Sequence, residues 1–189
     1  MQERILHIKN MVCHRCILAV ADILRQEGLE AQHIELGTAT LPAPPTAEQR
    51  ERLRKRLKEY GFELLDDRRQ CLIEQIRTAV IEYVRYDDSA RKTNLSDYLT
   101  RKCRHDYSAL SRLFSEANGT SIERYYILQR VERVKELLIY DELSVSEIAD
   151  RMGYSSAAHL SAQFKNVTGM SPTRFKQLKD RRIRPIDSI

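Results

Sequence analysis

Residues 105–126 read HDYSALSRLFSEANGTSIERYY, and residues 155–176 read SSAAHLSAQFKNVTGMSPTRFK. Shifted by fifty positions, the second run superposes on the first without a gap. The pairs that match across this shift are Leu110 with Leu160, Ser111 with Ser161, Phe114 with Phe164, Gly119 with Gly169, Ser121 with Ser171 and Arg124 with Arg174. A repeat of this kind indicates the internal duplication of one helical unit.

Each copy predicts a short helix, a tight turn and a second helix. The first copy places these at 95–103, 104–107 and 108–118, and the second at 144–152, Gly153 and 155–167. One such pair also occurs in purely structural bundles, but two pairs joined by the long helix 121–140 are more specific. Nineteen residues of that helix span about 28 Å, close to the roughly 34 Å repeat of DNA. Two second helices held in this way can enter successive major grooves.

The outward side of each second helix supplies the candidate base readers. Leu110, Phe114 and Ala117 are predicted to face the core, as are their counterparts in the second copy. The predicted DNA-contacting residues are Ser108, Ser111, Arg112, Ala158, His159 and Ala162, with Lys165 and Arg104 on phosphates. Arg112 suits a bidentate guanine contact; a phosphate or surface role is its alternative, as solvated surface is for His159. The two alanines reach only a thymine methyl group.

The part before residue 68 predicts a small β-α-β-β-α-β domain. Residues 4–10 alternate as a strand, 16–28 have a helical apolar face, and 33–41 read as two short strands around Gly37. Thr46 is a good N-cap for a second helix that Gly61 ends, and 62–67 is the last strand. This order is the split ferredoxin-like arrangement. We place the domain boundaries at 1–68 and 69–182, followed by a tail at 183–189.

Charge and composition narrow the class of protein only mildly. Residues 1–70 carry 12 basic and 11 acidic side chains, and residues 71–189 carry 20 and 16. This excess permits a polyanionic partner without requiring one. No apolar run approaches the roughly 20 residues of a membrane span, and residues 1–10 lack a signal-peptide core. We expect a soluble, cytoplasmic protein, in which Cys71 and Cys103 are small buried hydrophobes.

Cys13 and Cys16 form a CxxC pair before the first helix. Two thiolates at a helix N-terminus have lowered pKa values and can chelate one soft ion such as Cu(I). Zinc would want four ligands, and only His14 and His7 are nearby as extras. Met11 is better explained as a packed anchor of the loop than as a ligand. A redox-active dithiol and a vestigial pair in a scaffold domain remain alternatives.

Two family resemblances follow from these residues. The first 68 residues resemble the heavy-metal-associated domain of copper chaperones and metal-transporting ATPases, through Met11, Cys13, Cys16 and Gly61-Phe62; Asn10 stands where that family has glycine.

Residues 70–180 resemble the DNA-binding domain of AraC/XylS-type transcription regulators, which implies seven helices and promoter binding. The residues that carry this second resemblance are Ile148, Ala149, Gly153, Phe164, Lys165, Gly169, Ser171, Pro172 and Phe175, with Leu110, Ser111, Arg112, Phe114, Gly119 and Tyr125 in the first copy. Arg104 replaces the usual turn glycine of the first copy.

The sequence therefore predicts an α+β protein: a ferredoxin-like domain, then an all-α domain with two helix-turn-helix motifs. We expect a regulator that binds double-stranded promoter DNA, activates transcription with RNA polymerase, and senses Cu(I) or another soft metal through Cys13 and Cys16. The alternative is a metal-independent regulator whose first domain serves dimerisation or redox sensing; a homodimer is left open. A DNA methyl-acceptor repair enzyme would need four zinc-binding cysteines, and a copper chaperone would leave the second domain unexplained. No catalytic constellation stands out, so we expect a non-enzyme.

Overall fold

The computed structural model describes residues 4–85, 93–140 and 142–177. The chain forms two compact units, Met1–Thr78 and Ala79–Ile189. The division falls inside helix α3 (Arg68–Arg85), whereas the predicted boundary lies at the beginning of that helix. The first half of α3 therefore belongs to the N-terminal unit and the second half to the C-terminal unit.

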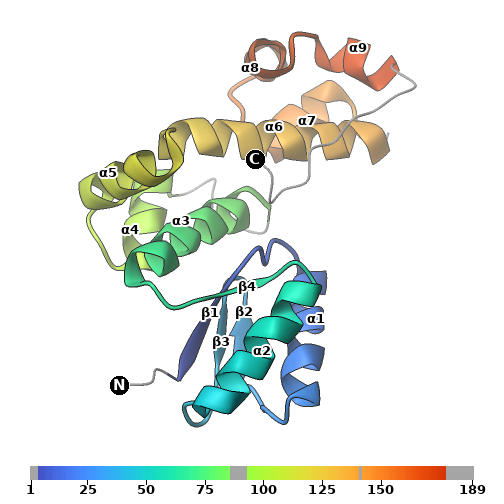
Figure 1. Ribbon diagram of the computed structural model, residues 1–189. Coiled ribbons are helices and arrows are strands. Elements are labelled where there is room, and N and C mark those ends of the chain that lie inside the picture. The colour runs from blue at the N-terminus through green and yellow to red at the C-terminus, as the bar shows by residue number, and fades with distance from the viewer. Residues whose placement is uncertain (1–3, 86–92, 141, 178–189) are drawn as a thin grey trace. The chain divides into compact units, whose positions relative to one another are not determined.

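The N-terminal unit contains a four-stranded sheet with two helices, as predicted. Its strands are β1 (Ile5–Lys9), β2 (His33–Glu35), β3 (Thr38–Thr40) and β4 (Glu63–Leu65), in the order β2-β3-β1-β4. All neighbouring strands are antiparallel, with Leu6 opposite Ala39 and Ile8 opposite Leu64. Helices α1 (His14–Gln26) and α2 (Ala47–Glu59) complete the β-α-β-β-α-β order (Figure 1). This is the ferredoxin-like arrangement that the alternating residues predict.

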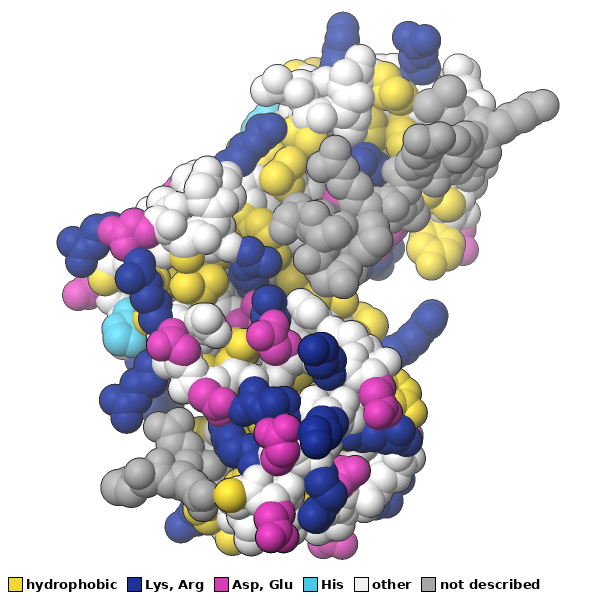
Figure 2. Space-filling view, viewed as in Figure 1, with side chains coloured by type: hydrophobic (Ala, Val, Ile, Leu, Met, Phe, Trp, Pro, Cys, Tyr) yellow, Lys and Arg dark blue, Asp and Glu magenta, His cyan; other side chains and the backbone are white. Residues whose placement is uncertain are grey.

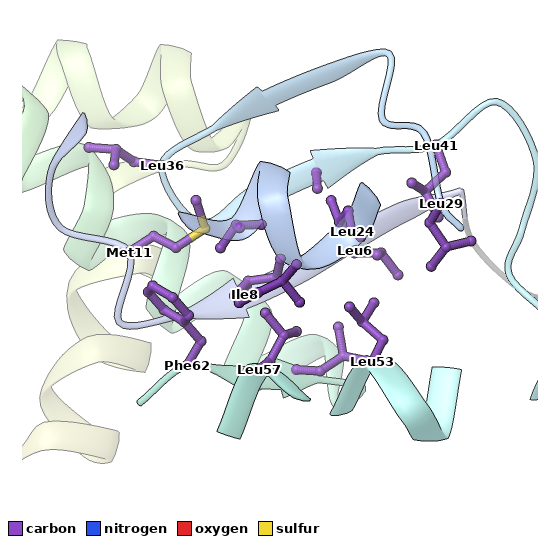
Figure 3. Packing of buried hydrophobic residues seen from close by; sticks show 14 residues of the cluster. Leu6, Ile8, Met11, Leu24, Leu29, Leu36, Leu41, Leu53, Leu57 and Phe62 are labelled. Carbon is purple, nitrogen blue, oxygen red and sulfur yellow. The ribbon is translucent and has the colours of Figure 1, made fainter. Parts of the chain in front are cut away.

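Apolar side chains from every element of this order form one core (Figure 3). Because side chains alternate along a strand, Leu6 and Ile8 point inward from β1 while their neighbours remain partly exposed. The α1 and α2 helices contribute one apolar side each. Members of the core with almost no exposed surface are Leu6, Ile8, Met11, Val20, Ala39, Leu53 and Leu57. The predicted packing of Met11 is thus what the structure shows.

Local polar contacts determine where α2 begins and how its outer side is charged. The Thr46 hydroxyl accepts from the Gln49 backbone N–H, and the Gln49 side chain accepts from the Thr46 N–H, a complete capping box. Further along α2, Arg50 and Arg54 both pair with Asp66. Basic and acidic side chains are intermixed over this unit in the view of Figure 2. The basic side chains of this part are therefore largely balanced locally.

Every regular element among the described residues of the C-terminal unit is a helix. After α3 come α4 (Leu95–Cys103), α5 (Tyr107–Asn118), α6 (Ile122–Tyr140), α7 (Val145–Arg151), α8 (Ala157–Thr168) and α9 (Pro172–Gln177). Figure 1 shows α4 and α5 at one end of α6 and α7, α8 and α9 at its other end. Seven helices in the described ranges agree with the predicted domain, and the predicted end of α3 at residues 86–87 lies outside those ranges.

The two copies repeat each other in contacts as well as in letters. The rings of Phe114 and Tyr125 have centroids 5.5 Å apart, and those of Phe164 and Phe175 are also 5.5 Å apart. Each second helix ends in a left-handed glycine, Gly119 or Gly169, a conformation that glycine adopts without the Cβ penalty. The predicted duplication is confirmed.

Two details differ from the sequence-based expectations. Ala117, predicted to face the core, is exposed, because α5 ends one residue later and nothing packs over so short a side chain. Of the α3 residues predicted to face inward, Ile76, Val80 and Ile81 are buried, but Leu72, Ile73 and Val84 are only half-buried. As expected from the sequence, no helix in the described part of the chain is long and apolar enough to cross a membrane.

Candidate functional site

The predicted DNA-contacting residues lie on the outer surface of the two helix-turn-helix units. Arg104 stands at the first turn, and the others lie on α5 and α8. Seven of them are exposed and Ser111 is half-buried; the exposed ones are Arg104, Ser108, Arg112, Ala158, His159, Ala162 and Lys165. Buried neighbours fix this orientation, because Leu110 and Phe114 anchor α5 as Leu160 and Phe164 anchor α8. Each helix thus presents one side to solvent.

The exposed side of α5 is the more polar of the two. Arg112 makes no hydrogen bond or ion pair with any described residue, so its five donors are directed to solvent. Ser108 lies one turn earlier on the same side. The equivalent position on α8, fifty residues later, is Ala162, whose side chain is a single methyl group. The polar groups suited to base edges are therefore concentrated on the first copy.

His159 is the polar group on the exposed side of α8, and it is held at two points. Its backbone N–H donates to the Ser156 hydroxyl, which caps the helix, at 3.1 Å. Its ring Nδ1 lies 3.0 Å from the Ser155 Oγ. The ring also stands edge-on to Tyr154, with centroids 5.3 Å apart. By contrast, Asp106 at the start of α5 makes no side-chain cap bond within the described residues.

One group of residues near α8 escaped the sequence analysis. Arg130 of α6 stacks on Tyr154, and the Tyr154 hydroxyl donates to Gln163 of α8 at 2.7 Å. The signal available in the sequence was the spacing of Tyr126 and Arg130, four residues apart on one side of a helix. That spacing alone does not reveal that a turn from elsewhere in the chain packs against it.

The thiols of Cys13 and Cys16 lie side by side at the beginning of α1. Their sulfur atoms are 3.6 Å apart, and Cys13 occupies the N-cap position. Burial alone would raise the pKa of the Cys13 thiol. Hydrogen bonds from the Cys16 backbone and thiol and from the Arg15 backbone outweigh burial, so this pKa lies below its ordinary value. Burial raises the pKa of the Cys16 thiol. The pair thus contains one more acidic and one less acidic thiol.

The loop that carries the two thiols is fastened at its first residue. Asn10 has a left-handed backbone, with φ of 72°. Glycine adopts this conformation readily, which explains why the heavy-metal-associated domains that this part resembles have glycine at the position of Asn10. Its side-chain amide donates to the Gly61 carbonyl at 2.9 Å, and its backbone N–H donates to the Glu74 carboxylate of α3 at 3.1 Å. Met11 follows and is fully buried. Glu74 is a further residue of this site that the sequence analysis missed.

The donor set of the thiol pair fits a soft ion with few ligands. A separation of 3.6 Å leaves both sulfurs within reach of one ion whose bonds to thiolate are about 2.3 Å. Groups of three or more Cys, His, Asp or Glu side chains suited to a metal do not occur among the described residues. Among the described residues the donors are thus the two thiols, fewer than the four ligands of a structural zinc site.

Comparison with known proteins bears on the C-terminal half. Residues 99–178 match the family described as a helix-turn-helix domain. The Msm operon regulatory protein of Streptococcus mutans is 33% identical over 94 residues, which are 50% of this chain and 30% of that protein. The chain spans less than a third of the length of the curated relatives that it matches.

The chain is also similar to two solved structures. The C-terminal domain of AraT, a response regulator from Geobacillus stearothermophilus, is 24% identical and has a TM-score of 0.48, covering 61% of this chain and 97% of that one. The DNA-binding domain of AdpA in complex with a target DNA is 24% identical, with a TM-score of 0.43, covering 56% and 88%. The family match to residues 99–178 agrees with the two helix-turn-helix units that the structure shows in this part of the chain.

Proposed function

We propose that this protein is a transcription regulator that reads double-stranded promoter DNA with α5 and α8 in successive major grooves. The observation that supports this most directly is the length of α6. It has 19 residues, Ile122–Tyr140, or about 28 Å, and the two helix-turn-helix units lie at its opposite ends. The helical repeat of DNA is roughly 34 Å, so both reading helices address one face of a duplex.

The two helices contribute unequally to this reading. Arg112 on α5 is exposed and suited to a bidentate contact with guanine, with Ser108 and Ser111 beside it. On α8, Ala158 and Ala162 offer only methyl groups for a thymine, and His159 is the polar reader. Lys165 and Arg104 bind phosphates and set the register. Sequence discrimination therefore depends mainly on α5.

Selection of duplexes from a random pool by the full-length protein tests this function. We expect a selected sequence with two blocks of preferred bases about one helical turn, roughly 10 base pairs, apart. Footprinting should show protection on one face. Recovery of no preferred sequence, at any salt concentration that permits binding, contradicts the proposal. Transcription from a promoter carrying the selected site then tests activation together with RNA polymerase.

A second proposal concerns the N-terminal unit. The paired thiols of Cys13 and Cys16, 3.6 Å apart at a helix N-terminus, support the binding of Cu(I) or another soft ion, which would regulate the DNA-binding unit. The ion would supply two bonds to thiolate sulfur. Arg15 and the backbone N–H groups at the start of α1 stabilise the Cys13 thiolate that the ion requires.

Native mass spectrometry of protein titrated with Cu(I) under reducing conditions tests this second proposal. We expect one ion per chain, lost in the Cys13→Ser and Cys16→Ser variants but retained in Cys103→Ala, whose thiol is buried. The affinity for the selected duplex should differ between the metal-free and metal-loaded protein. Equal affinities would leave a metal-independent regulator, and the same mass spectra would show whether the protein forms a dimer.

A further inference from the structure

Helix α6 carries a guanidinium group that lies over two aromatic rings. The Arg130 Cζ lies 3.7 Å from the centroid of the Tyr154 ring and 5.3 Å from that of Tyr126. Its Nη2 donates to the backbone carbonyl of Met152 at 2.7 Å. A cation over an aromatic face is attracted by the ring quadrupole, and more strongly where water is excluded. Arg130 is therefore fixed in one position by three neighbours.

The carbonyl that Arg130 binds belongs to the turn between α7 and α8. Met152 is the C-cap of α7, and Gly153 after it is left-handed, with φ of 67°. The last carbonyls of a helix have no partner within the helix and carry partial negative charge. A guanidinium donor satisfies one of them with a charge-assisted bond. Arg130 thereby stabilises the turn geometry that directs the chain into α8.

Tyr154 extends these contacts to α8 itself. Its hydroxyl donates to the Gln163 side chain at 2.7 Å, and its ring meets the His159 ring edge-on. Gln163 and His159 are one turn apart on α8. Arg130 thus contacts Tyr154, and Tyr154 in turn contacts two residues of α8. The Tyr154 side chain is buried.

The first copy lacks the residues for such an arrangement. Fifty positions before Tyr154 stands Arg104, and fifty before Gln163 stands Leu113. At these two positions the first copy therefore has neither an aromatic ring nor an amide. The arrangement is thus specific to the second copy, whose exposed side is poor in polar readers and depends on close fit.

We infer that Arg130 is a positioning residue, which fixes the orientation of α8 in the groove through Met152 and Tyr154 without touching DNA. The inference rests on the proposed function. It predicts that changes at Arg130 weaken the reading of the bases under α8 and leave the reading of the bases under α5 unchanged.

The test uses the full-length protein, the duplex selected from random sequence, and duplexes with single base changes under α5 or under α8. Arg130→Lys keeps the charge but loses the planar stacking group, and Tyr154→Phe loses only the hydroxyl. We expect Arg130→Lys to reduce affinity about tenfold, as for a lost bond to a charged group. Discrimination should fall for changes under α8 only, and Tyr154→Phe should act in the same direction with a smaller effect.

Two readouts separate positioning from other roles. If Arg130 bound a phosphate, the uncharged variant Arg130→Gln would have a slope of log affinity against log salt smaller by about 1; we expect an unchanged slope. Arg133→Lys is the matched control, because Arg133 lies on the same helix and pairs with Glu136 at 2.8 Å. It should leave discrimination under α8 unchanged.

The outcomes distinguish failure of the inference from failure of the function. If the wild-type protein selects no sequence, the proposed function fails. If it does select one, the inference is overturned when folded Arg130→Lys reads bases under α8 normally, or when the salt slope of Arg130→Gln falls. Should Arg130→Lys not fold, normal discrimination by Tyr154→Phe overturns the inference instead.

Discussion

Arg104 and Gly153 both adopt the left-handed backbone conformation, with φ of 56° and 67°, at the turns that precede α5 and α8. They are not equivalent in the gapless repeat, because Arg104 lies ten residues before Phe114 and Gly153 lies eleven before Phe164. The two turns therefore perform the same change of direction with slightly different geometry. Because Arg104 has a Cβ atom, this left-handed conformation is less favourable for it than for glycine.

The steric cost of the left-handed conformation at Arg104 predicts that Arg104→Gly stabilises the protein. A residue with a Cβ loses about 1 kcal/mol or more in the left-handed region compared with glycine. We expect Arg104→Gly to raise the free energy of unfolding by about 1 kcal/mol, measured by urea denaturation. Gly153→Ala, the matched change in the second turn, should lower it by at least as much. A loss of stability in Arg104→Gly would contradict this explanation.

Arg112 and Lys165 should differ in the kind of affinity they contribute. Replacing Arg112 by alanine should remove about 1–3 kcal/mol of discrimination at one base pair. Lys165→Ala should weaken binding to all sequences alike and lower the salt slope by about 1. Titration of matched and mismatched duplexes at several salt concentrations measures both effects. Arg112 leaves the reading set if its alanine variant keeps wild-type affinity and preference.

Glu74 predicts a particular dependence of stability on pH. Burial raises the pKa of its carboxyl, although the Asn10 N–H opposes this. The folded protein therefore holds this proton more tightly than the unfolded chain, whose glutamate pKa is about 4.3. The stability contributed by Glu74 is present below that pH and is lost as the pH rises through the folded-state pKa.

Glu74→Gln keeps an acceptor for the Asn10 N–H and has no charge to bury. We expect this variant to unfold at a higher temperature than the wild type at pH 8, with the difference shrinking towards pH 4. Thermal unfolding followed across this range gives the difference directly. Glu30→Gln, at an exposed site, is the control and should show no such trend. A difference between Glu74→Gln and wild type that does not vary with pH would rule out this role.

The thiols should react in a fixed order. Because the pKa of Cys13 is lowered and that of Cys16 is raised, Cys13 has more thiolate near pH 7 and should be alkylated first. Burial raises the pKa of Cys103 to about 11, so Cys103 should remain unmodified in the folded protein. Brief treatment with iodoacetamide followed by tandem mass spectrometry reads the order. Modification of Cys16 before Cys13 would show that hydrogen bonding does not favour the Cys13 thiolate.

The buried amide of Gln129 in α6 suggests that replacing this residue would stabilise the fold. It is 1% exposed, and neither polar atom of its amide has a partner among the described residues. An unsatisfied buried polar group costs about 1–3 kcal/mol, and methionine has a similar length without that group. We expect Gln129→Met to raise the free energy of unfolding by about this amount. Gln163→Met, which removes the acceptor of Tyr154, should lower it; destabilisation by Gln129→Met would mean that its amide is satisfied in solution.

The regular elements and the duplication were predictable because they follow from periodicity and local signals. Thr46 with Gln49 marks the beginning of α2, and the apolar residues of α5 and α8 recur at helical spacing. The exposure of Ala117 was not predictable in this way. Its partner in the repeat, Val167, is long enough to pack against the core, while a single methyl group at the end of α5 is not.

The contacts that position the sites were predictable least of all. The Asn10–Glu74 hydrogen bond joins residues 64 positions apart, and Arg130 reaches the carbonyl of Met152, 22 positions away. Such pairs combine a polar side chain with a backbone group of the partner. Since every residue offers the same backbone groups, no residue type in the sequence marks the partner.

The number of residues in α6 also determines the rotation of α8 relative to α5 about the axis of α6. Each residue of an α-helix turns the chain by about 100° and advances it 1.5 Å. One residue inserted into Ile122–Tyr140 would therefore rotate α8 by more than a quarter turn about the axis of α6, away from the face of DNA that α5 addresses. Seven inserted residues would nearly restore the phase but separate the helices by about 10 Å more. The proposed reading of DNA therefore requires the number of residues in α6 to stay unchanged.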